Sequence, residues 1–247
     1  MYHIKCAEIW GGIDSADQGL ATNSIKASLY CKPFENLKGG DIYYFSVCEK
    51  EILTRFAIAD VAGHGAQVSE VSGQLFDSLS RNMNAMAGNI VLSDLNKEIW
   101  SETNKAITTA AIYTVNKLDA KLSFSTAGHP PFYMNRKGAN DWSEITLKNH
   151  TPKGNIPLGI WSETHFDEES INIETGDRFF FLTDGLLEVI DGEGQIFGRP
   201  KLLSILKHHN DSPPDILKKA ILKALKEHMG STLFRDDLTF MSMEINI

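Results

Sequence analysis

The stretch FAIADVAGHG, residues 56–65, places one carboxylate at the end of an apolar run and at the start of a glycine-containing loop. Four apolar residues precede Asp60, and Gly63, His64 and Gly65 follow it within five positions. An apolar run of this kind is typical of a buried strand, and glycine permits the turn that follows. We therefore expect a strand that ends by presenting the Asp60 carboxylate to a ligand.

Periodicity on either side of this stretch predicts groups of strands and helices. We expect strands at about 42–48, 53–60, 108–115, 121–128, 131–135, 171–184 (two strands around a Thr-Gly-Asp turn) and 236–247, and helices at about 66–86, 90–104, 199–208 and 213–228. Residues 11–24 are expected to form a loop, residues 139–169 to be irregular, and Ser212 to cap the last helix. Many strand pairs are joined by short turns, which favours antiparallel pairing; residues 42–48 and 53–60 form one such hairpin. The expected fold class is α+β, a four-layer α-β-β-α sandwich of two mostly antiparallel sheets.

Composition excludes several classes of partner. The chain has 247 residues, 42% of them hydrophobic, and a net charge of −8, which argues against nucleic acid or an acidic membrane surface as the main partner. No apolar run approaches the roughly 20 residues of a membrane span, and residues 1–10 lack the pattern of a signal peptide. Cys6, Cys31 and Cys48 match no zinc spacing. We expect a cytoplasmic protein without disulfides.

Aspartates recur at the ends of apolar strands. Asp41 enters one strand, Asp60 and Asp184 leave two others, and Asp236 and Asp237 precede the last. Any one of these sites taken alone is commonly just a turn. If the strand ends converge, two carboxylates about 4 Å apart repel by about 4 kcal/mol at an effective dielectric near 20, so a cation is required. Oxygen-only sites of this kind suit Mg²⁺ or Mn²⁺, and two such ions can activate a water and hold a phosphoryl group.

These motifs together resemble a known family. The segments GGDIYYF, IADVAGHG, STAGHPPFYM, PLGI, GDRFFFLTDGLLEV and FRDDLTF occur in the order found in the SpoIIE/RsbU-type branch of the metal-dependent PP2C-like (PPM) serine/threonine phosphatases. The resemblance covers about residues 38–245. It implies one PP2C-like phosphatase domain over 1–247, with 38–245 as the core and 1–37 as an N-terminal strand and loop extension.

The resemblance also implies roles for individual residues. Asp60 would bridge two Mn²⁺ or Mg²⁺ ions, and the carbonyl of Val61 would complete the protein ligands of the second ion. Asp41 would act on that second ion mainly through water. Asp184 and one of the Asp236-Asp237 pair, by alignment Asp236, would hold the first ion. The implied reaction is direct in-line attack of a metal-activated water on phosphoserine or phosphothreonine of a protein, without a covalent enzyme intermediate.

The substrate and the regulation are expectations of the same kind. A small phosphorylated regulator, such as an anti-sigma-factor antagonist of a partner-switching pathway, is the expected substrate. The helices at 66–86 and 90–104 follow the metal loop, so we expect a regulatory protein or a homodimer contact to act through them; in the plainer alternative they only cover the sheet. The sequence contains no arginine before Arg55, so the N-terminal phosphate-gripping arginine of the eukaryotic relatives is absent.

Alternatives to these roles remain. His64 is expected to pack in its loop or face solvent rather than transfer protons, and His129 to organise a proline-rich turn. Glu188 either orients a metal-bound water or forms a surface salt bridge. For the whole protein, the rival functions are a catalytically silent PP2C-like protein that binds a partner, and a hydrolase of small phosphoesters.

Overall fold

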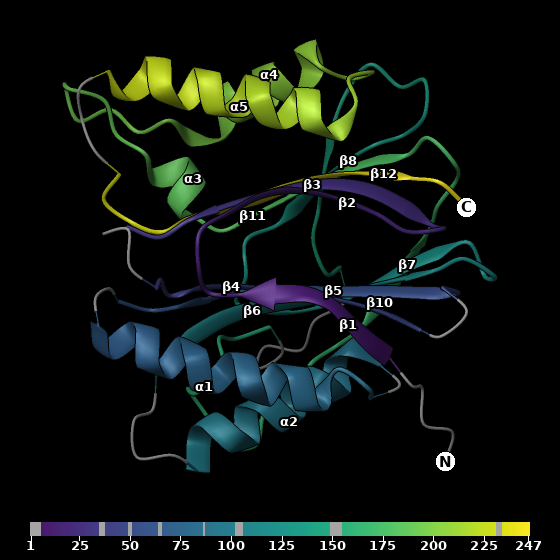
Figure 1. Cartoon of the computed structure of the whole chain (residues 1–247), viewed down its shortest axis with the longest axis vertical. Coiled ribbons are helices and arrows are strands. Elements are labelled where there is room, and N and C mark those ends of the chain that lie inside the picture. Colours follow the sequence, from purple (N-terminus) through teal and green to yellow (C-terminus); the bar gives the residue numbers. More distant parts are fainter. Residues whose placement is uncertain are drawn as a thin grey trace. The chain divides into compact units, whose positions relative to one another are not determined.

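The structure is a computed structural model that describes residues 6–34, 38–48, 51–63, 66–85, 87–101, 106–148, 155–230 and 234–247. The chain forms two compact units. Unit 1 contains Met1–Ile13, Leu37–His129 and Leu147–Ile173, and unit 2 contains Asp14–Asn36, Pro130–Thr146 and Glu174–Ile247. Each unit consists of one six-stranded sheet with its own helices (Figure 1).

Unit 1 is built on the sheet β1-β4-β5-β6-β7-β10, in which every neighbouring pair of strands is antiparallel. Its strands are β1 (Cys6–Gly12), β4 (Asp41–Cys48), β5 (Leu53–Val61), β6 (Thr108–Asn116), β7 (Lys121–Ala127) and β10 (Glu169–Asn172). Helices α1 (Ala66–Asn82) and α2 (Gly88–Ser101) lie along one face of this sheet (Figure 1). The hairpin expected from residues 42–48 and 53–60 is confirmed as β4 and β5.

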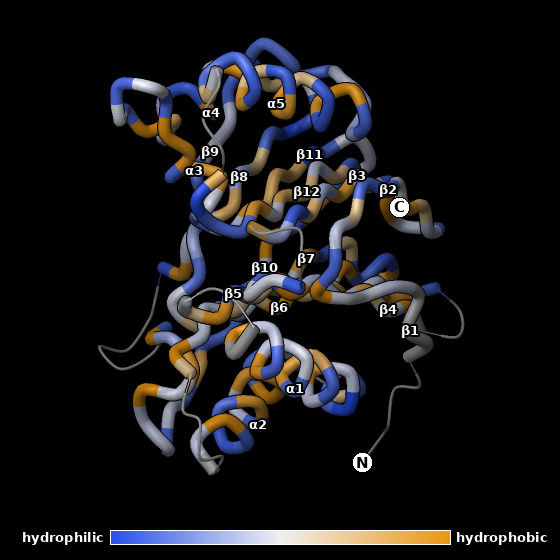
Figure 2. The backbone as a smooth tube through the Cα atoms, turned by 60° about the vertical axis from the view of Figure 1, so that its left-hand side comes forward, coloured by the Kyte–Doolittle hydropathy of each residue, from blue (hydrophilic) through white to orange (hydrophobic). Residues whose placement is uncertain are grey.

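The core of unit 1 explains the amphipathic pattern of its helices. Figure 2 shows hydrophobic and hydrophilic stretches alternating along α1 and α2. Leu75, Leu79, Leu92 and Leu95 pack with Ala57 and other residues from one face of the sheet. Because side chains alternate along a strand, Ala57, Ala59 and Val61 face the helices whereas Asp60 faces the opposite side of the sheet.

Unit 2 is built on a second antiparallel sheet, β2-β3-β12-β11-β8-β9. Its strands are β2 (Ala16–Ala21), β3 (Ile25–Lys32), β8 (Phe132–Asn135), β9 (Ser143–Ile145), β11 (Arg178–Leu182) and β12 (Leu238–Ile245). Its helices are the single turn α3 (Gly185–Glu188), α4 (Gly198–His208) and α5 (Pro214–Met229). Leu202, Leu217 and Ile221 pack with Phe180 and Phe240 to form its core.

Three expectations about local structure are wrong. Residues 11–24 are not a loop, because β1 extends to Gly12 and residues 16–21 form β2. β2 is an edge strand with mostly exposed side chains, so it carries no alternating hydrophobic signal. The short strand β9 lies within the segment expected to be irregular, and it pairs with β8.

The third wrong expectation is the helix cap, and the two strands expected at 171–184 belong to different sheets. Both of these strands are present: β10 joins β7 in unit 1, and β11 joins β8 and β12 in unit 2. Hydrophobicity alone does not identify the pairing partner of a strand. The N-cap position of α5 is Pro213, and the side chain of Ser212 instead hydrogen-bonds His209.

The helix bounds differ slightly from those expected. Helix α1 ends at Asn82 rather than near 86, and α2 runs from Gly88 to Ser101, with 102–105 outside the described residues. None of the helices in the described part of the chain is long and apolar enough to cross a membrane.

Candidate metal centre

Asp41 and Asp60 stand directly opposite each other on neighbouring strands of unit 1. Asp41 opens β4, and its register partner on β5 is Asp60. Directly opposed residues of an antiparallel pair share one face of the sheet, with Cβ atoms about 4.5–5.5 Å apart. The Asp41 side chain is 1% exposed. Two like charges in this position destabilise the sheet unless a positive charge compensates them, so the pair suits a cation.

Thr109 extends this row onto β6. Its register partner is Asp60, so it flanks the carboxylate on the side away from Asp41. The Thr109 hydroxyl hydrogen-bonds Nδ1 of the buried His129 at 3.1 Å. His129 therefore contacts the residue that flanks Asp60. Sequence reasoning did not identify Thr109, since a threonine in an apolar strand is an unremarkable residue.

The loop after Asp60 is held by backbone hydrogen bonds. The Val61 N–H donates to the Gly40 carbonyl at 3.2 Å, and the Ala62 N–H donates to the Ile107 carbonyl at 2.9 Å. Gly63 has a φ of 112°, which L-residues rarely adopt, and this explains why glycine is needed in the turn. His64 and Gly65 lie outside the described residues.

Helix α1 contacts the loop that precedes Asp41. The Ser72 hydroxyl bonds the Val68 carbonyl at 2.8 Å and lies 3.4 Å from the Gly40 carbonyl. The Ser69 hydroxyl donates to the Lys38 carbonyl. The Gly40 carbonyl therefore lies next to α1 and next to Val61, so a displacement of α1 would disturb both carboxylate-bearing strand ends.

Arg55 of β5 is bound to the end of α1 and does not lie on the Asp60 face of the sheet. It is 3% exposed and donates to the carbonyls of Met83 at 2.9 Å and Ala85 at 2.5 Å, just beyond the C-terminus of α1. Its Nε also donates to the Thr114 hydroxyl. Arg55 lies five positions before Asp60 and thus on the opposite face of the sheet. A charged residue inside an apolar strand was the signal for this role.

Unit 2 brings Asp184 next to the Asp236-Asp237 pair. Beyond the end of β11, the Thr183 N–H donates to the Thr239 carbonyl at 2.9 Å, and the Thr239 N–H donates to the Thr183 hydroxyl at 3.2 Å. Gly185 then approaches the second strand so closely that an added Cβ would lie under 3.0 Å from the Asp237 carbonyl oxygen and 3.6 Å from the Asp236 Cβ. This close approach requires a residue without a side chain.

The two neighbouring aspartates have different surroundings. Oδ1 of Asp237 accepts a hydrogen bond of 2.6 Å from the Phe34 N–H, and this residue is 6% exposed. Oδ1 of Asp236 accepts the Asp237 N–H at 2.8 Å. Asp236 also lies close enough to Glu188 to perturb its ionisation. The Asp237 carboxylate is thus used to hold the end of β3, and this favours Asp236 as the ligand.

Glu188 belongs to the same group of carboxylates. Partial desolvation raises the pKa of Glu188, and the nearby charges of Asp184 and Asp236 raise it further. The groups that perturb it are thus carboxylates rather than a cation. Such a shift is expected where several acids gather at a place meant for a positive ion.

Each unit therefore carries part of the predicted ligand set. Unit 1 brings together Asp41, Asp60 and Val61, and unit 2 brings together Asp184 and Asp236. Among the residues that the structure describes, no group of three or more His, Cys, Asp and Glu side chains could by itself hold a metal ion. The donor chemistry nevertheless fits Mg²⁺ or Mn²⁺, since all the predicted donors are carboxylate or carbonyl oxygens.

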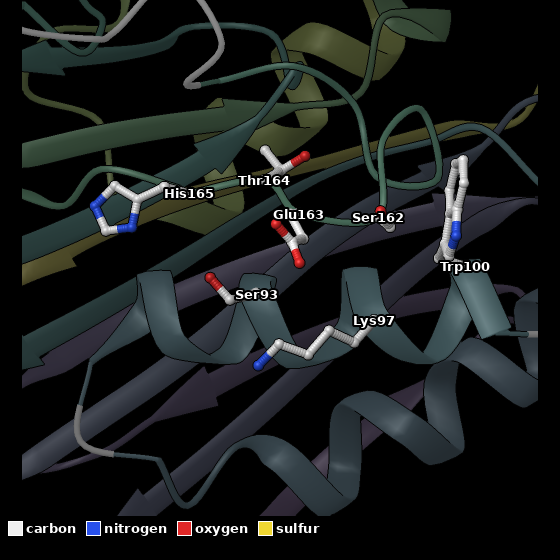
Figure 3. A pocket seen from close by; sticks show the side chains of 7 residues that line it. All are labelled: Ser93, Lys97, Trp100, Ser162, Glu163, Thr164 and His165. Carbon is white, nitrogen blue, oxygen red and sulfur yellow. The ribbon is translucent and has the colours of Figure 1, made fainter.

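A separate pocket of about 640 Å³ lies in unit 1, away from these carboxylates in the sequence. Figure 3 shows α2 on one side of it and the segment 162–165 on the other. It is lined by Ser93, Lys97, Trp100, Ser162, Glu163, Thr164 and His165. None of these seven residues is a predicted metal ligand.

Comparison with known proteins identifies relatives over nearly the whole chain. The family model of Stage II sporulation protein E (SpoIIE) matches residues 52–246. Phosphoserine phosphatase RsbP of Bacillus subtilis is 22% identical over 240 residues, which cover 94% of this chain and 55% of RsbP. The chain thus spans about half the length of this relative.

Two solved structures have the same fold. The SiaA-PP2C domain of Pseudomonas aeruginosa gives a TM-score of 0.76 at 20% identity and covers 88% of this chain and 85% of that one. RsbX in complex with magnesium gives a TM-score of 0.68 at 18% identity and covers 93% of this chain and 100% of that one. The expected PP2C-like fold class, with its two antiparallel sheets, is thereby confirmed.

Proposed function

Since the chain belongs to the SpoIIE family, we propose that it is a metal-dependent protein phosphatase that hydrolyses phosphoserine or phosphothreonine on a regulatory protein. An anti-sigma-factor antagonist of a partner-switching pathway is the kind of substrate we propose, and the cytoplasm is the proposed location. The observation that carries this proposal is the cross-strand pair of Asp41 and Asp60. Two opposed carboxylates at the ends of buried strands repel each other, and a bound cation offsets this repulsion.

The proposed ligand set follows the donors described above. Asp60 would bridge two Mn²⁺ or Mg²⁺ ions, with the Val61 carbonyl and, through water, Asp41 on the second ion. Asp184 and Asp236 would hold the first ion. When bound, the ions supply an activated water and neutralise the charge on the phosphoryl oxygens. RsbX, a structural neighbour, was solved with magnesium, which supports a divalent cation here.

The chain's own residues orient this chemistry. The direction of the Asp60 side chain is fixed because both neighbouring strands, β4 and β6, pair with β5 in register. Thr109, fixed by its bond to His129, limits the movement of the Asp60 carboxylate on one side. Gly185 lets the strand end that carries Asp184 approach the Asp236-Asp237 backbone.

We further propose that a regulatory protein or a second copy of the chain acts through α1 and α2. The contacts of Ser69 and Ser72 with the loop before Asp41 support this, since they join α1 to a carboxylate-bearing strand. Helix α2 is joined to α1 through Glu98, which accepts hydrogen bonds from Ser78, Arg81 and Asn82. If substitutions of exposed residues on both helices left turnover unchanged with every partner tested, the helices would be only a cover for the sheet.

The direct test is hydrolysis of p-nitrophenyl phosphate with and without Mn²⁺. We expect metal-dependent turnover in the wild type and its loss in Asp60→Asn, which keeps the size of the side chain but removes its charge. Asp237→Asn is the matched control, because its carboxylate holds the Phe34 N–H and is not a proposed ligand. Absence of turnover in the wild type on this substrate and on a panel of phosphoproteins would favour a silent, partner-binding protein.

The panel of phosphoproteins also separates the two enzymatic alternatives. A protein phosphatase releases phosphate from at least one phosphoserine or phosphothreonine protein at a higher kcat/KM than from p-nitrophenyl phosphate. A hydrolase of small phosphoesters shows the reverse preference. Phosphoserine proteins come first in the panel, because RsbP is a phosphoserine phosphatase.

A further inference from the structure

The end of β6 that flanks the Asp60 strand is paired with a segment from far along the chain. Leu158 forms an antiparallel bridge with Thr108: the Leu158 N–H donates to the Thr108 carbonyl at 2.8 Å, and the Thr108 N–H donates to the Leu158 carbonyl at 3.2 Å. On its other side, Thr108 is the register partner of Val61, and Thr109 that of Asp60. Leu158 therefore lies only one strand away from the proposed metal ligands.

One anchor of this segment is Asn155. Its Oδ1 accepts hydrogen bonds from the Thr126 hydroxyl and from the Gly128 N–H, and its carbonyl accepts the Gly128 N–H at 2.9 Å. Gly128 has a φ of 66°, and an added Cβ would lie 2.5 Å from Cγ of Pro157. The motifs STAGHPP and PLGI are thus packed against each other, and this explains the glycine in the first of them.

The second anchor is Asn96, in the middle of α2. Its Oδ1 accepts the Gly159 N–H at 2.9 Å, and its Nδ2 donates to the carbonyls of Trp161 at 2.8 Å and Ser162 at 3.2 Å. The residue is 1% exposed. All three hydrogen bonds of this buried amide are therefore directed at the backbone of one short segment.

These contacts form a continuous path from α2 to the carboxylate row. Asn96 holds Gly159, the neighbouring Leu158 pairs with Thr108, and Thr108 pairs with Val61. Every step is a hydrogen bond or a strand pairing between backbone groups or a buried amide. Because such contacts do not stretch freely, a displacement of α2 at Asn96 moves the strand end beside Asp60.

We propose that Asn96 is a positioning residue that sets the end of β6 against the Asp60-Val61 strand end, and so sets the affinity for the metal. The part of this proposal that concerns metal affinity rests on the proposed function. Its structural part, the coupling from Asn96 to β6, stands independently. Asn96 touches neither substrate nor metal and acts through the 158–162 segment.

The pocket beside this path supplies a matched control. The Ser162 carbonyl bound by Asn96 belongs to a residue that lines the pocket, and Lys97 lines it from α2 (Figure 3). Lys97 is exposed and forms an ion pair with Asp94 on the same helix at 3.0 Å. Lys97→Ala therefore changes the neighbouring position on α2 and the same pocket without touching the anchor.

The test compares Asn96→Ala with Lys97→Ala and wild type by hydrogen exchange and by calorimetric titration with Mn²⁺. For Asn96→Ala we expect faster exchange in peptides covering 156–163 and also 106–111, because the Gly159 amide loses its acceptor and the Leu158–Thr108 bridge is no longer held from α2. We expect the Mn²⁺ affinity to fall about tenfold, the low end of the loss seen when an outer-shell partner of a metal ligand is removed. Lys97→Ala should match the wild type in both measurements.

Two results would overturn the proposal. One is exchange that rises only in 156–163, with 106–111 protected and Mn²⁺ affinity unchanged, which would make Asn96 a simple loop anchor. The other is an equal effect of Lys97→Ala. If the wild type binds no Mn²⁺, the proposed function fails, and the exchange of 106–111 alone still decides whether Asn96 positions β6.

A second variant guards against misfolding of Asn96→Ala. Asn155 has a φ of 64°, so Asn155→Gly keeps the backbone conformation and the backbone hydrogen bond to Gly128 while removing the side-chain acceptor. It loosens the same segment from its other end. It should raise the exchange of both peptides in the same way, and unchanged exchange of 106–111 would contradict the proposed path.

Discussion

Replacing Gly185 by alanine adds one methyl group at the point where β11 and β12 carry the acidic residues of unit 2. The new Cβ would lie under 3.0 Å from the Asp237 carbonyl oxygen, whereas ordinary van der Waals contact begins at 3.4 Å. The backbone must therefore open by more than the roughly 0.5 Å that a functional constellation tolerates. The obstacle is a main-chain carbonyl rather than a flexible side chain. Asp237 is also tied to Phe34, so the opening is resisted.

Two opposing free-energy terms set the size of the effect. Gly185 is the first residue of α3 and has no positive φ, so alanine on its own would stabilise by up to about 1 kcal/mol. Overpacking at a tightly fitted position costs about 1–3 kcal/mol and occasionally more. We expect a net loss of about 1–2 kcal/mol, which lowers the melting temperature by roughly 2–8 °C for a chain of this size. Without the clash, the melting temperature would rise instead.

We expect Gly185→Ala to lower the rate of turnover more strongly than it lowers thermal stability. A functional constellation tolerates about 0.5 Å of displacement, and a misplacement of about 1 Å costs on the order of a hundredfold in rate. Because the strain falls between Asp184 and Asp236, we expect Mn²⁺-dependent hydrolysis of p-nitrophenyl phosphate to fall about tenfold to a hundredfold. The assay is initial-rate kinetics over a range of Mn²⁺ concentrations, with thermal unfolding of the metal-free protein measured in parallel.

Gly192→Ala is the matched control. An added Cβ at Gly192 meets nothing within 4 Å, and this glycine has no positive φ. It tests the effect of one extra methyl group without the clash, and it should be neutral or slightly stabilising. If Gly185→Ala equalled Gly192→Ala in melting temperature and turnover, the close approach of Gly185 to Asp237 would not be what requires glycine there.

Three further perturbations test the interactions around the two carboxylate groups. Arg55→Met leaves the buried Met83 carbonyl and the half-buried Ala85 carbonyl without this donor, so we expect a loss of about 3 kcal/mol and a melting temperature lowered by roughly 6–12 °C; a change below about 2 °C would contradict this. Desolvation raises the pKa of Glu98, but the hydrogen bonds from α1 lower it more, and the net pKa lies below 4.5. The ionised Glu98 side chain therefore stabilises the fold at neutral pH, and this stabilisation is lost on acidification. Glu98→Gln should therefore destabilise at pH 7 in urea unfolding, and this loss should disappear as the pH falls through the lowered pKa of Glu98; an equal loss at neutral and strongly acidic pH would point to packing alone. The pKa of Glu188 is raised above 4.5, so the ionised form of Glu188 destabilises the fold as the pH rises. Glu188→Gln should therefore stabilise the metal-free protein at pH 7. A gain in stability that persists below about pH 4 would show that the charge is not the cause.

The strands and helices that carry strong periodicity were predictable from the sequence. Helix α1 was recognisable because its apolar residues recur every three or four positions, and the β4–β5 hairpin because two apolar runs flank a short charged turn. Strand β2 was missed because an exposed edge strand has no such pattern, and the pairing partners of β10 and β11 were not predicted. The pairing partners of a strand depend on contacts between distant segments, and the local hydrophobicity of the strand does not identify these segments.

The candidate ligands show the same division. Each of Asp41, Asp60, Asp184 and Asp236 could be picked out from the chain, because a carboxylate that ends an apolar strand is a local feature. The neighbours of Asp60 could not all be found in this way. Thr109 flanks it, and Leu158 extends the sheet beside β6, only because strand register brings together residues separated by about 50 to 100 positions. The chemistry of a candidate ligand can be inferred from residues that are its neighbours in the sequence. The residues that support the site contact backbone atoms that only folding brings beside them, as Asn96, Arg55 and Gly185 do.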